Sequence, residues 1–197
     1  MAKPMTMLRE KLFNAVLYFA KNTRYCNTTK ISKLLYFLDF VHFKETGYPS
    51  IGLKYYTFTR GPVPKDFWLE IRDGNVPEDF KDKLRLMQKT DELSPGYKET
   101  EFIAIAGPDM DVFSPREKKI LENLAFIYKE SRASTISEVT HLANQPWDIT
   151  KKKKGLNKPI DYIDSIDSKS SVSLDEAVDS IKDYDETIRN LHLEPTR

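Results

Sequence analysis

The segment from Thr28 to Ile71 constrains the fold more than any other part of this chain. It begins with apolar residues at helical spacing, which predict an amphipathic helix. The aromatic and β-branched residues of Lys54–Thr59 then predict a β-strand. Arg60-Gly61-Pro62-Val63-Pro64 follows, and neither proline can donate to a sheet ladder, so we expect the strand to end there. The block is typical of a recognition scaffold, because no residues in or around it form a catalytic set.

Two helices are predicted in the first quarter of the chain. Apolar residues recur at helical spacing from about Met5 to Lys21 and give the first helix one apolar stripe. The second helix is expected to begin at Thr28 or Thr29, whose hydroxyl would cap its free N–H groups, and to stop at Gly47. Aromatic residues widen its apolar face, so this helix should be buried on most sides.

Short elements are predicted after the proline-rich turn. A helix near Lys65–Ile71 is followed by a turn at Asp73-Gly74-Asn75 and by another short helix over Pro77–Met87. The alternation in Tyr97–Ala106 predicts one or two strands.

Three capping boxes predict helix starts in the second half, at Ser114–Glu117, Thr135–Glu138 and Ser173–Glu176. The second of these helices should end near Asn144. The stretch Lys151–Ser171 has weak periodicity and is expected to be loop or linker. The fold class is therefore α+β: a helix-dominated single domain with a small antiparallel sheet and a C-terminal amphipathic helix. We divide the chain into a main domain (1–150), a charged linker (151–172) and an acidic amphipathic C-terminal helix (173–197).

Composition limits the function classes. Hydrophobic residues make up 40% of the chain, which fits a folded protein, and no apolar run approaches the roughly 18 to 20 residues of a membrane helix. The single cysteine, Cys26, excludes internal disulfides and predicts a reducing cytoplasm. The net charge of +1 hides a segregation, because residues 161–197 hold ten acids against four bases. We expect this acidic tail either to pack on the basic body, to meet a basic partner or to be a solvated helix surface.

The residues that could carry chemistry are sparse. Of three histidines, only His141 lies in a suggestive context, HLANQPW, and no H-x-x-x-H pair supports a zinc site. No glycine-rich phosphate loop is present. The expectation is therefore no catalytic residue, no metal and no cofactor, with a His141-centred enzyme kept as an alternative.

Two surfaces are candidates for partner binding. The first is the turn that carries aromatic, proline and arginine side chains, residue types found at interface hot spots and also in ordinary cores; it comprises Arg60, Pro62, Pro64, Phe67 and Trp68. The second is the apolar face of the C-terminal helix, which either closes the domain's own core or docks into a partner; it comprises Val178, Ile181, Tyr184 and Ile188.

Nucleic acid is a further candidate partner. Lys151, Lys152, Lys153 and Lys154 follow a short helix and could contact phosphates, and the helices beginning at Ser114 and Thr135 are compatible with helix-turn-helix packing. Against this, no helix combines arginines with Asn or Gln for reading bases. A solvated lysine loop explains the run equally well.

Four motifs in order resemble a known family. A helix containing Lys30, Lys33, Leu34, Leu35 and Tyr36 precedes a Gly61-Pro62-Val63 turn, and Phe113-Ser114 with Glu117 precedes His141 and Pro146-Trp147. Their order and spacing, over about Lys3 to Trp147, resemble the Panacea domain of SocA-like antitoxins from bacterial toxin–antitoxin systems. The set Lys33, Tyr36, Gly61, Pro62, His141, Pro146 and Trp147 is expected to serve structure as much as binding. Gly61 should supply a backbone geometry that other residues resist, Trp147 should be a buried anchor, and His141 should bond locally to orient the Pro-Trp segment.

The resemblance implies a non-enzymatic antitoxin that neutralises a cognate protein toxin by direct binding. It leaves two alternatives open: a DNA-binding regulator, and a proteolytic adaptor that delivers the toxin to a protease. The cognate toxin is thus the expected partner, with DNA at Lys151–Lys154 and homodimerisation kept open, and no membrane.

Overall fold

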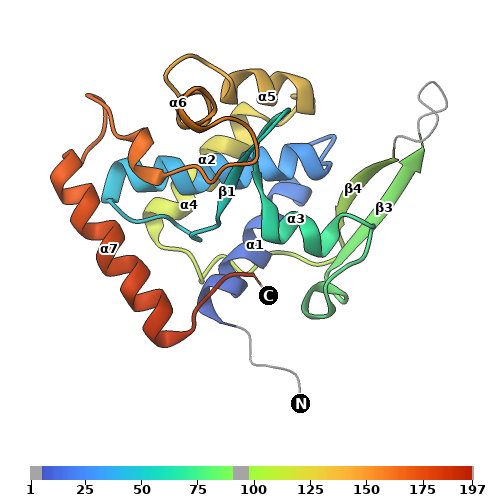
Figure 1. Ribbon diagram of the computed structural model, residues 1–197. Helices are drawn as coiled ribbons and strands as arrows, with labels where there is room; N and C mark the ends of the chain where they lie inside the picture. Colours follow the sequence, from blue (N-terminus) through green and yellow to red (C-terminus); the bar gives the residue numbers. More distant parts are fainter. Residues whose placement is uncertain (1–5, 91–97, 197) are drawn as a thin grey trace.

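The computed structural model describes residues 6–90 and 98–196, and it centres on one long buried helix (Figure 1). This helix, α2, spans Thr28–Thr46 and ends where Gly47 adopts a left-handed conformation (φ 79°). Its N-cap is Asn27, whose side chain accepts from the Lys30 backbone, so the expected cap at Thr28 or Thr29 is wrong by one residue. The first helix, α1, spans Met7–Asn22; the start predicted at about Met5 lies outside the described residues.

A two-stranded antiparallel sheet follows, formed by β1 (Tyr55–Phe58) and β2 (Gly61–Pro64). The prediction that Gly61–Pro64 only ends a strand is wrong, because this segment pairs back on β1. The reason lies in the register: Pro62 pairs with Thr57, whose backbone N–H and C=O bond residues 157 and 158 on the other side. β1 therefore needs no backbone N–H donor from residue 62, and a proline is tolerated there.

The predicted short helix Lys65–Ile71 is confirmed as α3. The helix expected over Pro77–Met87 is wrong: only the 3₁₀ turn η1 (Glu78–Phe80) is helical, and Leu84–Thr90 is strand β3. It pairs antiparallel with β4 (Lys98–Ala104), whose expected first residue, Tyr97, lies outside the described residues. Pairing between distant residues overrides the local helical spacing here. This hairpin projects from the helical body (Figure 1).

Helix α4 (Pro115–Ile127) begins with the predicted capping box at Ser114 and packs on α1 and α2. Helix α5 spans Ala133–Thr140, two residues ahead of the predicted start at Thr135, and Arg132 is its N-cap without a side-chain bond. The capping box predicted at Thr135–Glu138 is therefore wrong, because these residues already lie inside the helix.

The lysine run is helical. Helix α6 spans Pro146–Lys154, so the loop expected from Lys151 is wrong over its first four residues. Residues 157–160 then run beside β1, with Ile160 N–H donating to Tyr55 at 2.8 Å. The 3₁₀ turn η2 (Tyr162–Ser165) brings Tyr162 onto α2, where its ring stacks on Phe40 with centroids 4.6 Å apart. Residues 155–165 thus cover part of the core; the division of the chain at 150 and 172 stays a prediction.

Helix α7 (Leu174–Leu191) begins with the predicted capping box at Ser173 and runs along one side of the body (Figure 1). Beyond it the chain returns to α1, where Pro195 is buried. Helices dominate and the two sheets are small and antiparallel, which confirms the predicted fold class. None of the helices in the described part of the chain has the length and apolar character needed to cross a bilayer.

Candidate functional site

The motif residues from three separate segments meet over Gly61. Lys33 is buried on α2 and donates from Nζ to the Pro62 carbonyl oxygen at 2.7 Å. Gly61 has φ 100°, a backbone conformation that side chains rarely adopt, as the sequence predicted. A Cβ at Gly61 would lie 2.7 Å from Lys33 Nζ, 2.8 Å from Thr140 Oγ1 and 2.9 Å from His141 Nε2. We call these four residues, Lys33, Gly61, Thr140 and His141, the Gly61 cluster.

Burial controls the charge of this cluster. It lowers the pKa of Lys33 to about 7, since a buried ammonium loses its hydration. The pKa of His141 is also lowered, first by burial and then by the positive charges of Lys33 and Lys151, while a bond with the Arg60 backbone opposes the shift. His141 Nε2 is buried and has no hydrogen-bond partner among the residues that the structure describes. The cluster therefore favours neutral side chains.

A second group of motif residues packs beside the Gly61 cluster. The imidazole of His141 stacks on Trp147, with ring centroids 4.1 Å apart and planes tilted by 20°. Trp147 is buried and donates from Nε1 to the Phe58 carbonyl at 3.1 Å. Pro146 occupies the first turn of α6, where a missing N–H costs nothing. His141 thus supports the Pro-Trp segment by ring stacking, a contact that the sequence did not predict.

Tyr36 completes the motif set on the inner face of α2. Its ring lies 4.2 Å from Phe40 and 5.4 Å from Tyr55, centroid to centroid, and burial raises its pKa. The motif residues are therefore mainly internal, and they join α2 to β2, α5 and α6.

A groove lined by polar residue types opens next to His141. Its cavity volume is about 370 Å³, and residues from α2's N-terminus, the β1–β2 turn, β4 and α5 form its walls, among them Asn27, Arg60, Glu99 and Glu138. A smaller neighbouring hollow of about 260 Å³ is lined by Arg60, Trp68 and Arg72. Arg60 and Trp68, two of the predicted partner-binding residues, thus lie at accessible positions. Pro62, Pro64 and Phe67 from the same prediction are buried.

The predicted second surface faces the body. Val178, Ile181, Tyr184 and Ile188 of α7 are half-buried, and the Tyr184 hydroxyl donates to the Ile51 carbonyl at 3.2 Å. A Cβ on Gly52 would collide with that hydroxyl, so the glycine allows α7 to approach. Their use in partner binding stays a prediction, and it would require α7 to move off the body.

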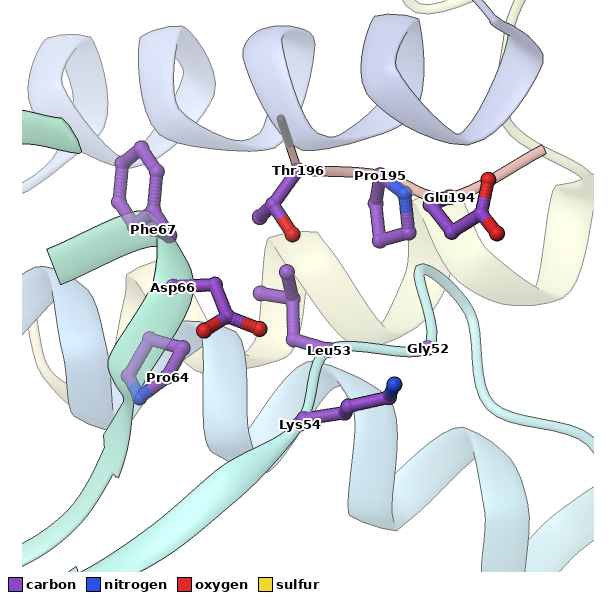
Figure 2. Close-up of a pocket in the computed structure, with 9 residues that line it drawn as sticks. All are labelled: Gly52, Leu53, Lys54, Pro64, Asp66, Phe67, Glu194, Pro195 and Thr196. Atoms are coloured by element: carbon purple, nitrogen blue, oxygen red, sulfur yellow. The ribbon is translucent and has the colours of Figure 1, made fainter. Parts of the chain in front are cut away.

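The C-terminal tail ties α7 to the start of α1. Arg9, which is buried, donates from Nη1 to the Pro195 carbonyl at 3.2 Å and binds Asp79 and Glu70, each at 2.8 Å. Figure 2 shows Pro195 and Thr196 across a cavity of about 220 Å³ from Leu53 and Asp66.

The four lysines of α6 are partly engaged within the chain. Lys151 lies over the Trp147 ring, with Nζ 4.6 Å from its centroid, Lys152 pairs with Asp148 at 2.7 Å, and Lys153 lies 3.6 Å from Asp164. Their contact with DNA stays a prediction, and these neighbours reduce the charge available for it.

Sequence reasoning missed Asp39, the most enclosed acid of α2. It accepts from the backbone N–H groups of Ile51, Gly52 and Leu53 at 2.6 to 3.2 Å, and from the Tyr55 hydroxyl at 2.9 Å. Burial raises its pKa even though these donors oppose the shift. An acid in the middle of the apolar stretch 34–41 was the available signal. Asp39 fixes the chain between α2 and β1 and has no accessible atom for chemistry.

The geometry defines a class of protein: an α+β domain with an internal polar cluster, two shallow polar hollows and an attached acidic helix. Among the described residues, no group of three or more His, Cys, Asp or Glu side chains could hold a metal ion.

Comparison with known families adds an identification. The family described as "Antitoxin SocA-like, Panacea domain" matches residues 31–148, more than half of the chain. The chain therefore belongs to the SocA-like antitoxin Panacea family, and the predicted resemblance is confirmed. No curated protein and no solved structure matches it.

Proposed function

We propose that this chain neutralises a cognate protein toxin by direct binding, without catalysis, in the cytoplasm. The observation that carries the proposal is its membership of the SocA-like antitoxin family. The direct mode of neutralisation goes beyond that membership and rests on the site.

Two features of the site support binding rather than chemistry. The histidine of the motif set has its Nε2 buried against Gly61 and its ring on Trp147, which leaves it poorly placed to exchange protons with a substrate. The accessible groups around it, such as Arg60, Trp68 and Glu138, line shallow polar hollows suited to contact with another protein surface.

Co-expression with the product of the neighbouring reading frame tests the proposal. We expect that product to arrest growth alone, this chain to restore growth, and the two proteins to copurify as an intact complex. Failure of both rescue and copurification would remove the proposal. A different outcome is that growth is rescued while the toxin disappears from the cells. If inactivating cellular proteases then restores the toxin level, the adaptor alternative is favoured.

A further inference from the structure

The C-terminal end of α4 carries two apolar side chains in solvent. Phe126 is 84% exposed and Ile127 is 62% exposed, although Ile127 follows Ile120 and Leu124 at helical spacing. The inner face is instead supplied by Ile120, Leu121 and Leu124, which are buried. Single exposed apolar residues are ordinary, whereas contiguous exposed apolar surface marks contact sites. Phe126 and Ile127 are adjacent, and Phe126 also lines a hollow.

A groove runs beside Phe126, between the C-terminal halves of α1 and α4. Its cavity volume is about 340 Å³; Tyr18, Ala125 and Phe126 supply its apolar part, and polar side chains form the larger part of its lining. Ala125 is buried and Tyr18 is half-buried, so the groove has a floor set by the packing of the two helices. An aromatic side chain at the edge of such a groove is the residue type that most often dominates binding energy.

The rim of the groove is positively charged. Two bases, Lys21 and Lys129, and one acid, Glu122, line it. The next acid along the chain, Glu130, pairs with Arg24 at 3.3 Å. A partner that places carboxylates at the rim would therefore be attracted, and a basic partner would be repelled.

We propose that Phe126, Ile127 and the adjoining groove form a docking surface for the toxin, which contributes an apolar side chain flanked by carboxylates. This inference rests on the proposed function, because it gives the same toxin a further contact surface, separate from the hollows beside His141.

A second copy of the chain fits this surface less well. A symmetric contact would bring Lys21 and Lys129 of both copies together, and like charges oppose it. A contact between this surface and the acidic α7 of another copy would be head-to-tail and would not close into a dimer. The toxin is therefore the occupant to which we commit.

The test measures the affinity of the full chain for the purified product of the neighbouring reading frame. Phe126→Ser should weaken binding by about 30-fold or more, as expected for a hot-spot aromatic. Ile105→Ser is the matched control, because Ile105 is also exposed (54%) but lines neither this groove nor the hollows beside His141, and it should bind as wild type. Both variants should unfold at the wild-type temperature, since each loses an exposed side chain.

A charge variant tests the rim. Lys129→Glu should slow association and weaken binding at low salt, with the difference shrinking as salt approaches about 1 M. Lys119→Glu, exposed on the same helix but outside the groove, is its control.

The outcomes separate the surface from the proposed function. Wild type that does not bind removes both. Wild type that binds together with an equally tight Phe126→Ser variant overturns the surface alone. A further outcome is that the wild type self-associates, with this self-association lost in Phe126→Ser and toxin binding unchanged. That result overturns the toxin surface and assigns it to a second copy of the chain.

Discussion

The Gly61 cluster and helix α7 are held to the body in different ways. Around the cluster, Lys33, Trp147 and their neighbours are buried and each makes a directional contact with a distant segment. Among the described side chains of α7, only that of Ala177 is fully buried. The directional bond of this helix to the body is the one from the Tyr184 hydroxyl to the Ile51 carbonyl. Buried polar and aromatic contacts are costly to break, whereas half-buried ones contribute less. The motifs that identify the family therefore maintain the body, and α7 is the more separable part.

Removal of the Trp147 side chain should have the largest effect. Trp147→Ala is expected to lower the free energy of unfolding by about 3–5 kcal/mol, because it leaves a cavity and removes the bond to Phe58. Chemical denaturation of both proteins measures the difference. Leu191→Ala on α7, where the side chain is 61% exposed, should change it by less than about 0.5 kcal/mol. Similar losses in the two variants would remove the contrast between the regions.

The pH dependence of stability should identify Lys33. Its pKa in the folded protein is lowered to about 7 from an ordinary value of 10.5, so between these values the unfolded chain binds more protons than the folded one. Stability should therefore rise with pH across this window, by at most about 1.4 kcal/mol per pH unit from this group.

Lys33→Met should lose that contribution to the pH dependence. The measurement is the difference in unfolding free energy between wild type and variant at several values from pH 6.5 to 10, with exposed Lys119→Met as the control. Parallel curves for wild type and Lys33→Met would show that Lys33 is not desolvated as described.

A charge at position 177 should detach α7 and spare the body. Ala177→Glu forces a carboxylate into a buried site beside Gly47, so amide hydrogen exchange in α7 should accelerate about tenfold or more. Amides of α2 should keep their wild-type exchange rates. Asp179→Ala, on the exposed side of α7, is the matched control, and equal acceleration in α2 would show that α7 and the body unfold together.

Loss of a single hydroxyl gives the smallest expected change. Tyr184→Phe removes the bond to the Ile51 carbonyl and should cost about 1 kcal/mol in thermal or chemical unfolding. Tyr48→Phe, at an exposed tyrosine, should cost nothing measurable. A loss above about 3 kcal/mol at Tyr184 would place α7 among the strongly held elements.

Local signals in the sequence predicted the elements they control. Gly47 ended α2, and the capping boxes at Ser114 and Ser173 began α4 and α7, because each signal acts within one turn of helix. The order of the family motifs also predicted the family.

The remaining features depend on residues far apart in the chain. Strand β2 tolerates its prolines because residues 157–160 lie on the other side of β1, and Arg9 is satisfied by Asp79 and Pro195. Neither pairing leaves a periodic signal, so the strand and the buried arginine could not be predicted. The sequence also could not place Ile127 in solvent, because its exposure depends on how α4 packs against α1 and α2.

The stoichiometry of neutralisation tests the central claim most directly. Purified toxin, the product of the neighbouring reading frame, is titrated with this protein while residual toxin activity and the intact masses of both chains are followed. If this protein acts by binding, inhibition will saturate at a fixed ratio of the two proteins and both masses will stay unchanged. Inactivation of a large molar excess of toxin, or a changed toxin mass, would contradict the account.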